Sequence, residues 1–169
     1  NFMLVASMNP CPCGYYNHPT KECNCSRYAV ERYMSKISGP LLDRIDIQIE
    51  VIPVDYNEMT AGKAEEPSSA IRQRVVAARE IQSRRFEGIE GVFTNAMMNN
   101  AMIAEFCPLD EQCTALLGKA MERLSLSARA YNRIIKVART IADLAGSEQI
   151  TTTHLAEAIG YRNLDRDSW

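Results

Sequence analysis

Four of the six cysteines in this 169-residue chain lie close together, in the stretch CPCGYYNHPTKECNC. Their spacing is C-x-C-x9-C-x-C, and Pro12, Gly14 and Pro19 are turn-forming residues within it. Such a loop has almost no apolar side chains to bury, so a hydrophobic core cannot order it. Two close pairs can place four thiolates tetrahedrally around one Zn²⁺. We therefore predict a structural zinc site formed by Cys11, Cys13, Cys23 and Cys25.

The spacing leaves two alternatives open. The usual pair is C-x2-C, so C-x-C is a departure, and His18 is a possible replacement for one ligand. Four free thiols are the other alternative, but free cysteine normally behaves as a small buried apolar residue, which does not suit a polar loop. Four protein ligands leave no open position for water, which makes the predicted site structural. Cys107 and Cys113 lie in a helical region, and we interpret them as packing residues.

Composition is that of an ordinary globular protein, with 46% apolar residues and a net charge of −2, which favours neither a nucleic acid nor a membrane as partner. No apolar stretch approaches the ~20 residues that span a bilayer. Residues 1 to 8 lack the basic flank of a secretory signal. We therefore expect a cytoplasmic, reducing compartment, where clustered cysteines favour a metal over disulfides. Because the chain begins without Met and inside an expected strand, we expect a fragment of a longer protein.

Residues 1–55 carry the pattern of an α/β unit. The apolar run FMLVASM is typical of a strand covered on both faces in a parallel sheet. Residues 27–37 have apolar positions at helical spacing, and the SGP that follows ends that helix. The segment IDIQIEVIP alternates apolar and polar residues and stops at Pro53, as a half-covered strand does. We predict parallel strands with helices, and a cysteine loop at 10–26 inserted after the first strand.

Residues 56–67 are polar and read as a linker, and residues 68–169 predict only helices. One helix follows Pro67 and places Ile71, Val75, Ala78 and Ile81 on one stripe. Others are expected at 97–106, at 110–124 and at 127–145, where Gly146 ends the helix. A short helix capped by threonine closes the series. The predicted architecture is an α/β core followed by an all-α subdomain.

Three blocks resemble the C-terminal half of Mg-chelatase-like AAA+ ATPases, of the competence protein ComM group. They are FMLVASMNPCPCG, YMSKISGPLLDRIDIQIEV and SLSARAYNRIIKVARTIADLAG, in the expected order and over nearly the whole chain. The resemblance implies an ATP-driven ring motor, expected to be a hexamer, in which residues 1–55 end the AAA+ core and residues 68–169 form the lid. The paired C-x-C loop separates this group from Mg-chelatase proper.

The resemblance also implies three ATP-handling residues. Asn9 matches the sensor-1 polar residue, Arg44 the arginine finger and Arg129 the sensor-2 arginine, with Arg133 as the alternative one turn later. Each has a structural reading beside the functional one. Asn9 begins a common turn dipeptide, and Arg44 has Asp43 and Asp46 as potential partners. Arg129 lies in the first turn of its helix, where the macrodipole disfavours a cation unless an anion is bound.

The phosphate-binding motif G-x-x-x-x-G-K-[ST] is absent, because AGKA at 61–64 lacks both the first glycine and the hydroxyl residue. In this family the Walker residues precede the part that resembles this chain. We therefore expect ATP and Mg²⁺ to bind only to the full-length protein, and the fragment alone to be inactive.

The resemblance implies DNA as the substrate, remodelled by branch migration. Local support comes from arginines on the helix after Pro67 and from tyrosines beside the cysteine loop. These residues are Arg72, Arg74, Arg79, Arg84, Arg85, Tyr15, Tyr16 and Tyr28. A solvated helix face and local packing explain them equally well. Two other functions stay open: a Mg-chelatase-type metal-insertion motor subunit, and a zinc-stabilised interaction module without enzymatic activity.

Overall fold

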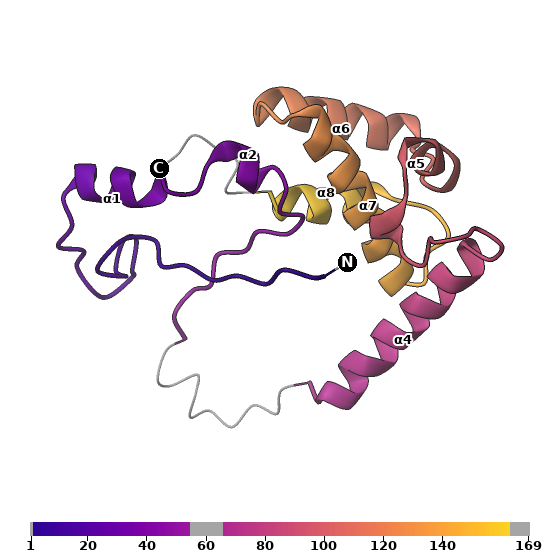
Figure 1. The fold of residues 1–169 in the computed structure, drawn as a ribbon, viewed down its shortest axis with the longest axis horizontal. Helices are drawn as coiled ribbons and strands as arrows, with labels where there is room; N and C mark the ends of the chain where they lie inside the picture. Colours follow the sequence, from indigo (N-terminus) through magenta and orange to yellow (C-terminus); the bar gives the residue numbers. More distant parts are fainter. Residues whose placement is uncertain (1, 55–65, 163–169) are drawn as a thin grey trace.

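The computed structural model describes residues 2–54 and 66–162, and every regular element in those ranges is helical. Two helices lie in the first range and five helices, with one 3-10 turn, in the second (Figure 1). The elements are α1 (Arg27–Met34), α2 (Gly39–Leu42), α4 (Ser68–Arg85), η1 (Asn95–Met97), α5 (Asn100–Phe106), α6 (Glu111–Arg123), α7 (Ala128–Leu144) and α8 (Thr152–Gly160).

The predicted α/β core is wrong for this structure, because the described ranges contain no strand or sheet. Both apolar segments expected as parallel strands are extended chain whose side chains face solvent, with Phe2 90% and Val51 81% exposed. An alternating pattern reports which side chains share a face, whereas a strand also needs a neighbouring backbone about 4.8 Å away. The Gln48 N–H instead donates to the C=O of Tyr161, at the end of a helix.

The helices begin where the sequence supplies side-chain caps. Ser26 accepts from the N–H of Ala29 to start α1, and Asp110 accepts from Cys113 at 2.7 Å to start α6. The predicted end of α7 at Gly146 is confirmed. This glycine has a φ of +66°, and the residue after it donates back to the last turn. The interval 56–67, predicted as a linker, lies almost entirely outside the described residues.

The hydrophobic core lies among α5, α6, α7 and α8. Leu117, Ile134 and Leu155 are each at most 1% exposed and belong to one cluster of buried side chains. Cys107 and Cys113 are in the same cluster, which confirms their interpretation as packing residues. Burial raises the pKa of each of these two thiols to about 11, so both stay protonated at neutral pH.

Helix α4 extends away from this core and is attached near its C-terminal end (Figure 1). Of its predicted apolar stripe only Ala78 is buried, while Ile71 and Val75 are 44% and 46% exposed. Phe86, which follows the last residue of α4, is buried in the core cluster, and a polar contact adds to this attachment. Arg85 donates two hydrogen bonds to Asp143 of α7, at 2.7 and 2.5 Å.

Asp143 is the centre of a buried polar network. It also accepts from Asn95 at 2.7 Å and from Arg139 at 3.1 Å, and all three side chains are at most 2% exposed. Arg139 further donates to the C=O groups of Ser147 and Glu148. Buried charges persist only when they are paired in this way, so the network joins α4, η1 and α7.

No helix within residues 2–54 and 66–162 has the length and apolar character needed to cross a membrane.

Candidate metal centre

The cysteine loop is folded by tight turns rather than by apolar packing. The N–H of Gly14 donates to the C=O of Cys11 at 3.1 Å, and Gly14 has a φ of +83°, which favours glycine. A second turn follows, in which His18 N–H donates to the C=O of Tyr15. These two reversals return the chain on itself, so that the second C-x-C pair lies beside the first.

The four sulfur atoms form a compact group. Cys11 Sγ lies 3.3 Å from Cys13 Sγ and 3.7 Å from Cys23 Sγ, and the Cys13 and Cys23 sulfurs are 3.5 Å apart. With Cys25 included, all four lie within 4.8 Å of one another. A tetrahedral Zn²⁺ with bonds of about 2.3 Å has S···S edges of about 3.8 Å. The four cysteines therefore fit a metal ion, as the spacing predicts.

His18 is not part of this group, although the sequence leaves it open as a ligand. Its Nδ1 accepts from the backbone N–H groups of Thr20 and Lys21, at 3.2 and 3.1 Å, and its ring packs edge-on against Tyr15. The imidazole thus supports the turn between the two cysteine pairs, and the donor set is four sulfurs.

Electrostatics within the cluster favour a cation. The backbone N–H of Tyr15, followed by the Cys11 thiol, lowers the pKa of Cys13 to about 6. At Cys23 the N–H of Cys25 acts in the same direction, but desolvation and the neighbouring thiols outweigh it and raise the pKa to about 12. Thiols this close cannot all ionise without a counter-charge, because their titrations are coupled. A bound cation removes that obstacle, since the thiolate is the form that ligates metals.

Other predicted residues lie outside the cluster. Asn9, two residues before the first cysteine, is exposed, and its side chain lies against Gly14. Arg44 is exposed at the end of α2 and donates to the C=O of Pro40 at 2.6 Å. Arg129 is exposed in the first turn of α7. Among residues 2–54 and 66–162, no hydrogen bond or ion pair joins any two of these three.

The aspartates beside Arg44 are bound by other arginines. Asp46 forms an ion pair with Arg133, and Asp43 lies 3.6 Å from a guanidinium nitrogen of Arg162. Arg44 itself makes neither contact in the described ranges, so the alternative that it merely neutralises its neighbours is wrong. Sequence reasoning missed these contacts, because Arg133 is 87 residues from Asp46, and Arg162 is 117 residues from Ile45, whose C=O accepts from it.

The arginines suggested for DNA contact differ in their surroundings. Arg85 belongs to the buried network, and Arg74 pairs with Glu66 at 2.7 Å. Arg72 and Arg79 are exposed on α4. Beside the cysteine loop, Tyr28 is 70% exposed. An exposed basic patch therefore remains on α4, smaller than the sequence suggests.

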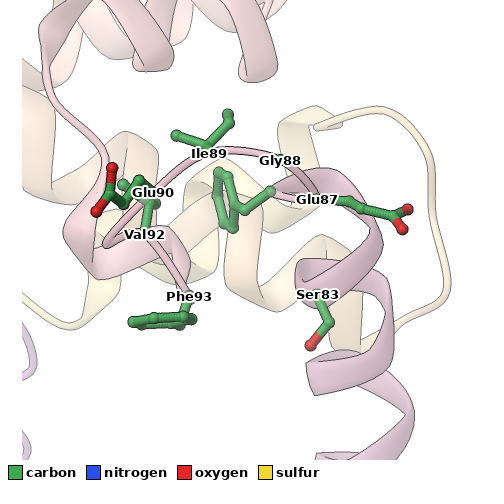
Figure 2. A pocket seen from close by; sticks show the side chains of 8 residues that line it. Ser83, Glu87, Gly88, Ile89, Glu90, Val92 and Phe93 are labelled. Carbon is green, nitrogen blue, oxygen red and sulfur yellow. The ribbon is translucent and has the colours of Figure 1, made fainter.

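One pocket of about 440 Å³ lies after α4, lined by residues 83 and 86–93 except Gly91. Figure 2 shows Ile89 and Val92 on the loop around it, with Phe93 at its edge. Glu87 and Glu90 point away from each other on opposite sides. The pocket is thus mainly apolar, without converging groups of the kind that carry out acid–base or nucleophilic chemistry.

Comparison with known families covers almost the entire chain. Residues 65–162 match the family described as magnesium chelatase, subunit ChlI C-terminal, and residues 1–59 match magnesium chelatase, subunit ChlI. The chain is 43% identical to competence protein ComM of Haemophilus influenzae over 166 residues. It is 40% identical to uncharacterized protein YifB of Escherichia coli and 33% identical to uncharacterized protein Rv2897c of Mycobacterium tuberculosis.

These alignments include 98%, 98% and 95% of this chain, but 31% of each relative. The chain therefore spans about a third of the length of the relatives that it matches.

Proposed function

This chain belongs to the magnesium chelatase ChlI family and is ComM-like, and on that premise we propose that it is part of an ATP-hydrolysing ring motor that remodels DNA. The observation that supports the proposal most is the 43% identity to a competence protein over 98% of the chain. The resemblance to this group implies DNA as the substrate.

We assign phosphate contact to Arg129 and the arginine finger to Arg44. Arg129 is exposed at the N-terminal end of the 17-residue helix α7, where the dipole and the first N–H groups attract an anion. Arg44 is exposed on the turn after α2, a position from which a long cation can reach a neighbouring subunit. Phosphoryl transfer needs mainly positioning and positive charge at the γ-phosphate, and both arginines supply charge. Asn9 would orient the attacking water.

ATP hydrolysis by the full-length protein tests these assignments. We expect Arg44→Ala to lower kcat at least a hundredfold, because an arginine finger is worth about 10³–10⁵ in rate. Arg123→Gln, at an exposed position of α6, is the matched control and should hydrolyse ATP normally. If Arg44 acts on the neighbouring subunit, mixing this variant with one that lacks the phosphate-loop lysine will restore activity. Full activity of Arg44→Ala would refute the finger assignment.

DNA binding has its own test. Fluorescence anisotropy with branched DNA and ATP should show affinity that falls with salt, because each neutralised phosphate releases counterions. We expect the paired change Arg72→Gln and Arg79→Gln to reduce the salt slope by about 2. Arg123→Gln is again the control. If no salt-sensitive binding appears while ATP is hydrolysed, the DNA role fails, and metal insertion with partner subunits, the function named by the matched family, takes its place.

We further propose that the cysteine cluster binds one structural Zn²⁺. Three of the S···S distances, at 3.3, 3.7 and 3.5 Å, are close to the edge of a tetrahedral site, and Cys25 Sγ lies within 4.8 Å of the other three sulfurs. Four protein ligands leave no position for water or substrate. Elemental analysis should find about one zinc per chain. Cys13→Ser should lose it, whereas Cys107→Ala, a buried cysteine outside the cluster, should retain it. Absence of metal from the wild-type protein, or iron in place of zinc, would refute the assignment.

A further inference from the structure

Hydrogen bonds attach the turn that carries Arg44 to the end of helix α8. Arg162, whose side chain is fully buried, donates to the C=O of Ile45 and lies 3.6 Å from a carboxylate oxygen of Asp43. Close by, the Gln48 N–H donates to the C=O of Tyr161 at 2.9 Å. Backbone and side-chain contacts therefore attach residues 43–48 to the helical body, although these residues belong to the extended first part of the chain.

An ion pair attaches the same turn to helix α7. Asp46 forms an ion pair with Arg133, and their side chains are 57% and 29% exposed. Lys136 lies one turn further along α7. Burial and then Arg133 lower the pKa of Lys136, while Asp46 acts in the opposite direction. Asp46 therefore pairs with Arg133, whereas Lys136 donates to the C=O of Ala96.

Helix α7 consequently presents two arginines with different tasks. Arg129 makes no hydrogen bond or ion pair within the described ranges, whereas Arg133 is held by Asp46. The two lie four residues apart, which corresponds to about 6 Å along a helix. An anion that moved the first turn of α7 would therefore also move the residue that holds the Arg44 turn.

We propose that Arg133 and Arg162 are positioning residues that fix the Arg44 turn to α7 and α8, so that phosphate contact at Arg129 and the placement of Arg44 are coupled. This inference rests on the proposed function of Arg44 and Arg129. Arg162 anchors the turn from a buried position, and the Asp46–Arg133 pair sets its orientation. An ion pair with one half-exposed partner adds little to global stability, so removing it should leave the protein folded.

The test is steady-state ATP hydrolysis by the full-length protein. We expect Arg133→Gln and Asp46→Asn each to lower kcat by about ten- to a hundredfold, because misplacing a reacting group by 1 Å costs up to about a hundredfold in rate. The KM for ATP should stay within twofold of the wild-type value. The exchanged pair, Asp46→Arg with Arg133→Asp, should recover most of the rate. Arg123→Gln, an exposed arginine of α6, is the matched control.

Hydrogen exchange reports the docking directly. The Gln48 amide donates to Tyr161, so its exchange should accelerate in Arg133→Gln and in Arg162→Lys, and return to the wild-type rate in the exchanged pair. This measurement requires no ATP hydrolysis.

Two results would overturn the inference. Arg133→Gln with unchanged kcat would show that the pair does not position Arg44. A raised KM for ATP that the exchanged pair does not correct would show that Arg133 contacts the nucleotide itself. By contrast, an active Arg44→Ala variant, or a wild-type protein that hydrolyses no ATP, would refute the proposed function, while the exchange rate of the Gln48 amide would still report whether the turn is docked.

Discussion

Removing the metal should unfold the cysteine loop and α1 while leaving the helical body intact. The perturbation is Cys11→Ser with Cys23→Ser, one ligand from each pair, or a chelator added to the wild-type protein. Among described residues before α2, the buried side chains are Cys11 and Val30. This part of the chain therefore has almost no hydrophobic core, and the proposed Zn²⁺ would be its main source of order.

The expected free-energy contributions support separate unfolding of the cysteine loop and the helical body. Burying Val30 contributes about 1.5–3 kcal/mol, and a helix of eight residues such as α1 is marginal on its own. A structural zinc site contributes about 10–16 kcal/mol in zinc-finger peptides, several times as much. The helical body instead has a continuous apolar cluster across α5 to α8. Loss of metal should therefore leave the unfolding free energy of that body unchanged within about 0.5 kcal/mol, as expected for independent sites.

Hydrogen exchange with mass spectrometry separates the two regions. The N–H of Val30 donates to the C=O of Ser26 and that of Ser35 to the C=O of Glu31, so α1 should be protected when the metal is bound. After chelation we expect this protection to disappear while α7 remains protected. Protection of α1 that survives complete metal removal would refute the reasoning. So would unfolding of α7 together with the loop, because it would make the two regions one cooperative unit.

Three further outcomes follow from the helical body. Asp143→Asn should destabilise the protein by about 3–5 kcal/mol in urea titration, because Arg139 is left buried without its counter-charge. Although burial alone would raise the pKa of Asp143, hydrogen bonds from Arg85 and Asn95 lower it, so its contribution should be complete above about pH 4 and be lost as pH falls through the folded pKa. Leu117→Ala, at a 1% exposed position, should cost about 2–5 kcal/mol, whereas an alanine at the 46% exposed Leu144 should cost well under 1 kcal/mol.

Helices were predictable because their signals are local. The prediction that Gly146 ends a helix is confirmed, and Ser26 and Asp110 cap the starts of α1 and α6 in the structure. The strands were not predictable in the same way, since a strand depends on a partner that the pattern does not name. The stripe on α4 failed for a related reason. Ile71 and Val75 have helical spacing, but their helix extends away from the core, and α4 is attached near its C-terminal end through Arg85 and the buried Phe86.

The candidate site residues were predictable only where their partners are close in the sequence. Cys11, Cys13, Cys23 and Cys25 could be grouped from spacing because turns within 15 residues bring them together. Asp46 and Asp143 could not be recognised, because the cations that define their roles come from distant elements. The arginines of α4 show the same limit. They look equivalent in the sequence, yet one is buried in a network and others are exposed.

Arg129 and Arg133 differ in their partners, and this difference bears on which of them contacts phosphate. The two residues have the same chemistry, lie on one helix and are one turn apart, so the sequence alone keeps both as candidates for phosphate contact. The structure separates them by their partners. Asp46 occupies Arg133, and an anion that bound there would have to displace a carboxylate, whereas Arg129 faces solvent at the positive end of the dipole. Phosphate contact is therefore less costly at Arg129, and this leaves Arg133 available to hold the Arg44 turn.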